Sequence, residues 1–114
     1  MSGTIEVRSS GLWTAASWLF DWVLNDLARS VQDKTTVDKL HEIVREHLGW
    51  LGINDLPEGG RREVLRSLCK SLMRDAEDQL PRDMASRDSA LRLLNELAQL
   101  ACQASEQDPS LRQP

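Results

Sequence analysis

Two histidines lie close together in the segment HEIVREH, at His41 and His47. Zinc-binding helices place two histidines four positions apart, because that spacing puts both rings on one face. Here the spacing is six, and at about 100° per residue the two rings point about 120° apart on a helix. Glu42 and Glu46 are four apart, which is a common spacing on any solvated helix. We therefore expect no metal site in this segment.

The two cysteines, Cys69 and Cys102, belong to no CxxC or CxxH pattern. Both are flanked by apolar or helix-forming residues, and one pair in a chain of this size is not a disulfide framework. We interpret them as small buried hydrophobic residues in a reducing compartment. Neither zinc ligation nor a cysteine nucleophile is predicted.

Serines, glycines and carboxylates, which form many catalytic and phosphate-binding sites, do not occur here in the sequence patterns of such sites. No serine lies in a glycine-flanked elbow of the kind that holds a nucleophile. Gly59 and Gly60 open a predicted helix that could bind an anion, but the Lys-Ser/Thr of a P-loop does not follow them. Carboxylate pairs such as Asp75/Asp78 and Asp83/Asp88 are spread over the predicted surface with no sign of a cleft. The sequence therefore predicts no enzyme activity and no cofactor.

Basic residues recur every four positions on a predicted third helix, and we call them the basic ridge: Arg62, Arg66, Lys70 and Arg74. Such a row can track the phosphates of a nucleic acid or bind an acidic protein. Glu63 and Glu77 lie within a turn of these residues and can pair with them, which favours a solvated face instead. No base-reading constellation accompanies the ridge.

Three of the four tryptophans fall in the segment LWTAASWLFDW, residues 12–22. On a helical projection Trp13 lies at the edge of an apolar stripe, whereas Trp18 and Trp22 lie on nearly the opposite side among polar residues. These two are either core residues of a helix covered on both sides or an exposed aromatic patch that binds a partner. The polar neighbours favour the rim of an interface. The candidate partner-binding residues are Trp18, Asp21, Trp22, Asp26 and Arg29, with Asp55 and Glu58 as a second surface.

The elements that position these residues are predicted to be mostly helical. Apolar spacing predicts helices over about 13–32, 37–51 and 61–79, and a fourth from a cap at Ser86 or Asp88 to about Ala104. The segment GINDLPEGG, residues 52–60, is the clearest loop. Residues 4–8 alternate apolar and polar, which suits a short strand or an extended arm, but no second strand is predicted to pair with it.

We therefore predict an all-α fold, a compact four-helix bundle-like domain with a short N-terminal extended arm or strand. Residues 1–11 would form the arm, 12–105 a single helical domain, and 106–114 a flexible C-terminal tail.

The chain has 114 residues, a formal net charge of −4, 40% hydrophobic residues and 28% charged residues, which is typical of one soluble domain. Its acidic balance disfavours nucleic acid and anionic membrane surfaces as partners. No signal peptide is recognised, and aspartates interrupt the first apolar run before it reaches a membrane-spanning length, so we expect a cytoplasmic localisation.

A small acidic domain without catalytic residues is expected to act by binding another protein. We predict a bacterial or phage inhibitor of the immunity-protein type, whose charge suits a basic toxin or nuclease. The alternatives are a nucleic-acid-associated regulator that uses the basic ridge, and a structural homodimer subunit. A monomer and a homodimer both fit the sequence.

Overall fold

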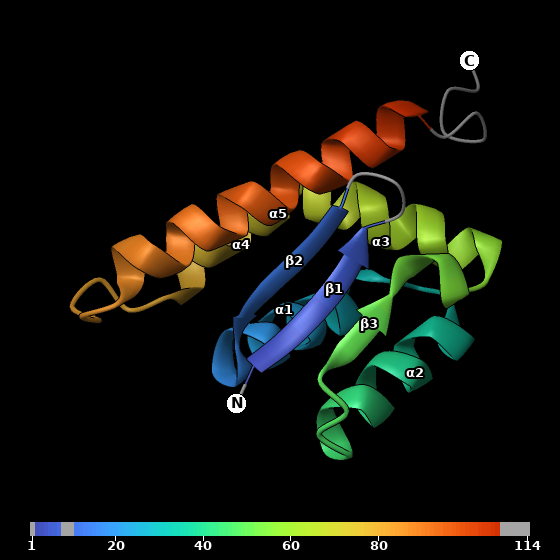
Figure 1. The fold of residues 1–114 in the computed structure, drawn as a ribbon, viewed down its shortest axis with the longest axis horizontal. Coiled ribbons are helices and arrows are strands. Elements are labelled where there is room, and N and C mark those ends of the chain that lie inside the picture. The colour runs from blue at the N-terminus through green and yellow to red at the C-terminus, as the bar shows by residue number, and fades with distance from the viewer. Residues whose placement is uncertain (1, 8–10, 108–114) are drawn as a thin grey trace.

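The computed structural model describes residues 2–7 and 11–107, and in that range five helices combine with a three-stranded sheet (Figure 1). The elements in chain order are β1 (Ser2–Val7), β2 (Gly11–Ala16), α1 (Ser17–Ser30), α2 (Lys34–Arg45), β3 (Trp50–Gly52), the short 3-10 turn η2 (Ile53–Asp55), α3 (Glu58–Lys70), α4 (Leu72–Gln79) and α5 (Arg87–Gln107). The predicted all-α fold is therefore wrong, because the chain has a mixed α/β fold.

The strand order in the sheet is β2-β1-β3, so β1 is the central strand. It pairs antiparallel with β2, where Thr4 lies opposite Thr14, and parallel with β3, where Thr4 lies beside Trp50. The hydroxyl oxygens of the two threonines are 3.0 Å apart. Residues 2–7 are thus an integral strand with two partners, and not a detached arm.

Strand β2 explains the largest error in the predicted helices. Trp13 is buried while Leu12 and Ala16 are exposed, which is the alternation of a strand. The same side chains also fit a helical spacing with the apolar residues that follow, so periodicity alone favoured a helix. Pairing with β1 supplies hydrogen-bond partners to the backbone of this segment. The indole N–H of Trp13 also donates to the carbonyl oxygen of Leu93 in α5 at 2.7 Å, and α1 begins only at Ser17.

The sheet is covered by helices on one face and open on the other. Ile5 and Val7 are fully buried, whereas Thr4 and Glu6, which alternate with them, are half-buried. Gly3 lies so close to α1 that an added Cβ would overlap the ring of Phe20. Figure 1 shows the strands in front of α1, with their open face toward the viewer.

Helix α2 starts at a polar cap. The side chain of Asp33 accepts hydrogen bonds from the backbone N–H of Thr36 at 3.0 Å and from its hydroxyl at 2.6 Å. The carboxylate of Glu63, in α3, accepts the backbone N–H groups of Gln32 and Asp33 at 2.8 and 3.0 Å. One acidic side chain of α3 therefore fixes the turn between α1 and α2.

Helix α2 ends at Arg45, before the predicted end at about residue 51. The N–H of Leu48 donates to the carbonyl oxygen of Ile43, and the N–H of His47 donates to that of Val44. These two bonds define a Schellman motif, in which His47 takes the left-handed conformation (φ 53°) that glycine usually occupies. The chain then enters β3 instead of continuing the helix.

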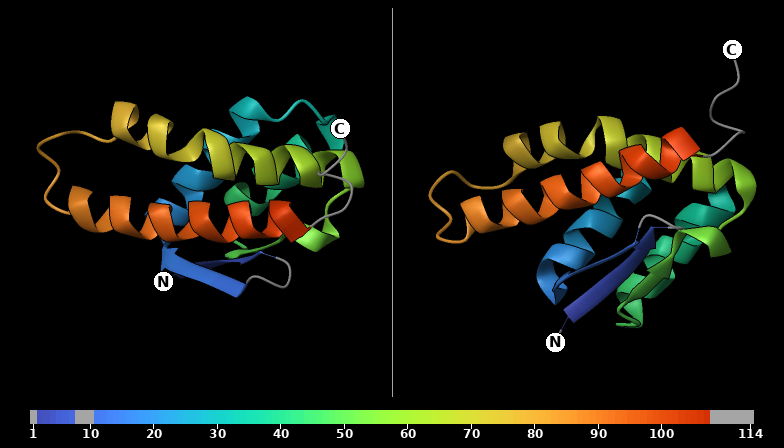
Figure 2. Two further views of the ribbon diagram at one scale, coloured as in Figure 1. Left: turned by 90° about the horizontal axis from the view of Figure 1, so that it is seen from above. Right: turned by 45° about the horizontal axis from the view of Figure 1, so that its top comes forward.

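The predicted third helix is divided into α3 and α4 at Ser71. Hydrogen bonding continues across this division, because the N–H of Ser71 bonds to the carbonyl oxygen of Ser67 and the N–H of Asp75 bonds to that of Ser71. Helix α5 extends past the predicted end at Ala104 to Gln107, so residues 106 and 107 of the predicted tail are helical, and the rest of that tail lies outside the described residues. Figure 2 shows α3 and α4 running antiparallel to α5 and beside it.

Candidate functional site

The structure separates the tryptophans into buried and exposed ones. Trp13 is buried in the core, and Trp22 is half-buried and packs against the core. Trp18 is 44% exposed, and so is Trp50, which the sequence did not single out. Of the two rings whose role was open, Trp22 thus contributes to packing and Trp18 is available to a partner. Partner binding itself stays a prediction.

Three of the four exposed large hydrophobic residues in the described ranges lie near one end of the sheet, and we call them the sheet-end residues: Trp18, Leu48 and Trp50. Ala16, two positions before Trp18, pairs with Ser2 at the start of β1. On the other side of β1, the N–H of Thr4 donates to the carbonyl oxygen of Gly49 at 2.9 Å. The sheet-end residues therefore flank the start of β1 from both sides. This end of β1 lies beside the label N in Figure 1.

Asp26 does not occupy the rim position that the sequence suggested, because it is only 4% exposed. Its carboxylate accepts a hydrogen bond from Arg29 at 3.1 Å, and Asp75 of α4 also contacts it. Burial and the hydrogen bond with Asp75 raise the pKa of Asp26 to about 6, against a smaller opposite effect of Arg29. Asp26 therefore belongs to the contact between α1 and α4 and is not available to a partner.

The remaining predicted binding residues stay accessible. Asp21 is half-buried and Arg29 is exposed, although Arg29 also donates to the side-chain oxygen of Gln79 at 2.8 Å. Asp55 in η2 and Glu58 at the start of α3 are both exposed. These two lie on a separate segment of the chain from Asp21 and Arg29, and their role as a second surface stays a prediction.

The basic ridge runs along α3 and continues into α4. Arg62 is half-buried, and the other three side chains are exposed. Among residues 2–7 and 11–105, whose side chains the structure describes, the ion pairs within 4.0 Å are Arg29–Asp26 and Arg45–Glu46, so the ridge has no carboxylate partner in that set. Glu63, expected to pair with the ridge, instead binds the backbone before α2.

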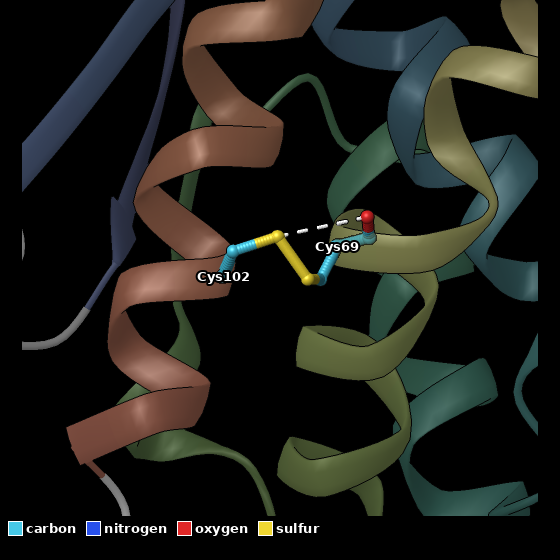
Figure 3. The surroundings of a disulfide bond; sticks show 2 residues. All are labelled: Cys69 and Cys102. Carbon is cyan, nitrogen blue, oxygen red and sulfur yellow. Dashed lines mark hydrogen bonds between the residues drawn. A yellow bond between two sulfur atoms is a disulfide. The ribbon is translucent and has the colours of Figure 1, made fainter.

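Cys69 in α3 and Cys102 in α5 form a disulfide bond (Figure 3). The interpretation of both as unpaired hydrophobic residues is therefore wrong. The two cysteines consequently give no support to the prediction of a reducing compartment. The antiparallel packing of α3 on α5 brings the two residues together across 33 positions of sequence. An even number of cysteines on two predicted helices was the available hint, but spacing does not reveal which helix faces meet.

The part of the chain that the structure describes holds no group of three or more His, Cys, Asp or Glu residues that could bind a metal ion. His41 and His47 are both exposed. The surface carries open hollows of about 540, 390 and 260 Å³, and neither Asp26 nor Asp75 lines any of these three. The contact between Asp26 and Asp75 is thus separate from these hollows.

Comparisons with protein-family models, curated proteins and solved structures found no match for this chain. Among the helices of the described residues, none is long and apolar enough to cross a membrane.

Proposed function

We propose that this chain is a small protein-binding module whose contact surface is centred on the sheet-end residues. The observation that supports this proposal is the exposure of Trp18, Leu48 and Trp50 around the start of β1, where their exposed fractions are 44%, 56% and 44%. Tryptophan is enriched among the residues that dominate binding energy at protein interfaces. Leu12, the fourth exposed large hydrophobic side chain among the described residues, lies apart from them, opposite Glu6 toward the other end of β1.

The partner that fits this surface is a protein with an apolar contact area and a positive net charge. The chain carries a net charge of −4, and Glu46 and the half-buried Asp21 lie within three positions of the sheet-end residues in sequence. Opposite charge raises the association rate, which suits an inhibitor that must capture a basic target. An inhibitor or immunity-type role is the finer form of this proposal and rests on charge alone.

The test has two steps. Capture and cross-linking in cells identify a candidate partner, and binding is then measured with both proteins purified. We expect Trp18→Ser and Trp50→Ser each to weaken binding about tenfold or more. Leu12→Ser is the matched control, because Leu12 is 61% exposed and lies opposite Glu6, toward the other end of β1. Equal binding by the two tryptophan variants and the wild type would refute this location.

The basic ridge, which forms no ion pair with the described side chains, favours a second candidate function, binding of nucleic acid. A gel shift at low salt that is lost in the Arg66→Glu, Lys70→Glu double variant and kept in Arg82→Glu would support it. Arg82 is exposed and lies outside the ridge. Absence of a shift at low salt would remove this candidate.

The proposal also covers the oligomeric state and the localisation of the chain. Light scattering tests whether the sheet-end residues are covered by a second copy of the chain, since a strict monomer excludes the homodimer. The expected cytoplasmic localisation is tested by trapping thiols in cells, because persistence of the Cys69–Cys102 bond there would place the chain in an oxidising compartment.

A further inference from the structure

Helix α5 is held against the rest of the fold in two different ways along its length. Its first half buries Leu94 and Leu97 completely. Over residues 98–105 the buried side chains are three alanines, Ala98, Ala101 and Ala104, and the one leucine there, Leu100, is only partly buried against the core. A methyl group removes much less apolar surface from water than a leucine side chain does, so burial holds the second half weakly.

The disulfide lies in this weakly held half. Cys102 is adjacent to Ala101 in α5, and Cys69 is the second-last residue of α3. Figure 3 shows the bond joining the two neighbouring helices directly. The disulfide therefore attaches the second half of α5 to the fold, where the buried leucines of the first half have no counterpart.

A small reductant can reach this bond from the surface. Both cysteines are half-buried, and both line the open hollow of about 390 Å³. The other lining residues carry no charge and include Met73, Gln99 and Gln103. The hollow thus presents no ionic barrier to an incoming thiolate.

The surroundings also suit the reduced state. The Sγ atom of Cys102 lies 3.6 Å from the carbonyl oxygen of Cys69, the contact drawn as a dashed line in Figure 3. A disulfide sulfur carries no hydrogen, so this contact can become a hydrogen bond only when Cys102 is a thiol. Reduction therefore replaces the covalent link with a weak one at the same place.

We propose that the Cys69–Cys102 bond is a redox-sensitive disulfide that holds the second half of α5 against α3. Its reductant is a dithiol that enters through the 390 Å³ hollow. One thiolate of the dithiol attacks a sulfur of the bond, which gives a mixed disulfide and releases the other cysteine as a thiolate. The second thiol of the reagent then closes its own disulfide, so that two electrons and two protons pass to the protein. Residues 98–107 can then open locally while the sheet and α1 stay folded.

Hydrogen exchange on the full chain, oxidised and reduced with dithiothreitol, tests the local release. We expect exchange of the amides in residues 98–107 to rise about tenfold or more on reduction, and to return when the bond is re-formed. The amides of Val23 and Leu27, in the buried face of α1, exchange through global unfolding and report only the general loss of stability, so their rise should be about tenfold or more smaller than that of α5. An unchanged α5, or an equal rise in α1, would overturn the proposal. The Cys69→Ser, Cys102→Ser variant should show the reduced pattern with and without dithiothreitol.

The rate of reduction tests the route through the hollow and does not require any cysteine to be replaced. Gln99→Trp places a large side chain at the hollow and should slow reduction by dithiothreitol severalfold. Arg92→Trp is the control, because Arg92 is exposed on α5 and does not line the hollow. Equal rates for the two variants would show that the reductant does not enter there.

Discussion

Replacement of Asp26 by asparagine should stabilise this protein at neutral pH. The carboxyl is 4% exposed, and its pKa is raised from 3.8 to about 6 by burial and by Asp75. Each pKa unit corresponds to about 1.4 kcal/mol, so ionised Asp26 costs the folded state about 3 kcal/mol at most at pH 7. Asparagine has nearly the same shape and no charge, but its amide must still find partners. We therefore expect Asp26→Asn to raise the unfolding free energy by about 1–3 kcal/mol.

The sign of the pH dependence follows from the raised pKa. Between pH 3.8 and about 6 the folded chain binds more protons at this site than the unfolded chain does. The contribution of Asp26 to the unfolding free energy therefore falls as pH rises through this window, and it is constant above it. Asp75 raises the pKa of Asp26 and Arg29 lowers it, because both side chains contact the same carboxyl.

Urea unfolding followed by tryptophan fluorescence measures this effect. The difference between Asp26→Asn and the wild type should be largest at pH 7 and should shrink toward zero near pH 4. Asp78→Asn is the control, because Asp78 is an exposed carboxylate on α4. A destabilised Asp26→Asn at pH 7, or a difference that does not depend on pH, would refute the reasoning.

Three further predictions concern the ends and links of the helices. Reduction of the Cys69–Cys102 bond, which closes a loop of 33 positions, should lower the unfolding free energy by about 3–4 kcal/mol in urea titrations, and an unchanged midpoint would contradict this. His47→Gly should raise the unfolding free energy by about 1 kcal/mol, because His47 holds φ at 53°, a left-handed conformation that costs glycine less. A loss of stability in thermal melts would argue against strain at this residue. Glu63→Ala should cost about 1–3 kcal/mol, because two backbone N–H groups lose their acceptor, whereas the exposed Glu42→Ala should be nearly neutral.

Sequence reasoning located most of the helical core but not the sheet. Helical spacing identified the interiors of α1, α2, α3 and α5, since each buries one apolar face over several turns. It could not identify β2, because Leu12 and Ala16 satisfy a strand and a helix equally until a partner strand is known. β3 has only three residues, which is too short for any periodicity.

The candidate site was only partly predictable for the same reason. Trp18 follows from the helical projection, but Trp50 gains its position from a parallel pairing with the start of the chain. The burial of Asp26 depends on how α4 packs against α1, and the disulfide depends on which faces of α3 and α5 meet. Local sequence patterns carry no information on such long-range contacts.

The position of β1 has a practical consequence for how this protein is handled. Ser2 begins the central strand and is flanked by the segments that carry Trp18, Leu48 and Trp50. An affinity tag or fluorescent protein fused ahead of Ser2 would emerge among those side chains and compete with any partner for them. The last described turn of α5 lies far from the start of β1 in Figure 1. A fusion placed after α5 would leave the open face of the sheet free for a binding experiment.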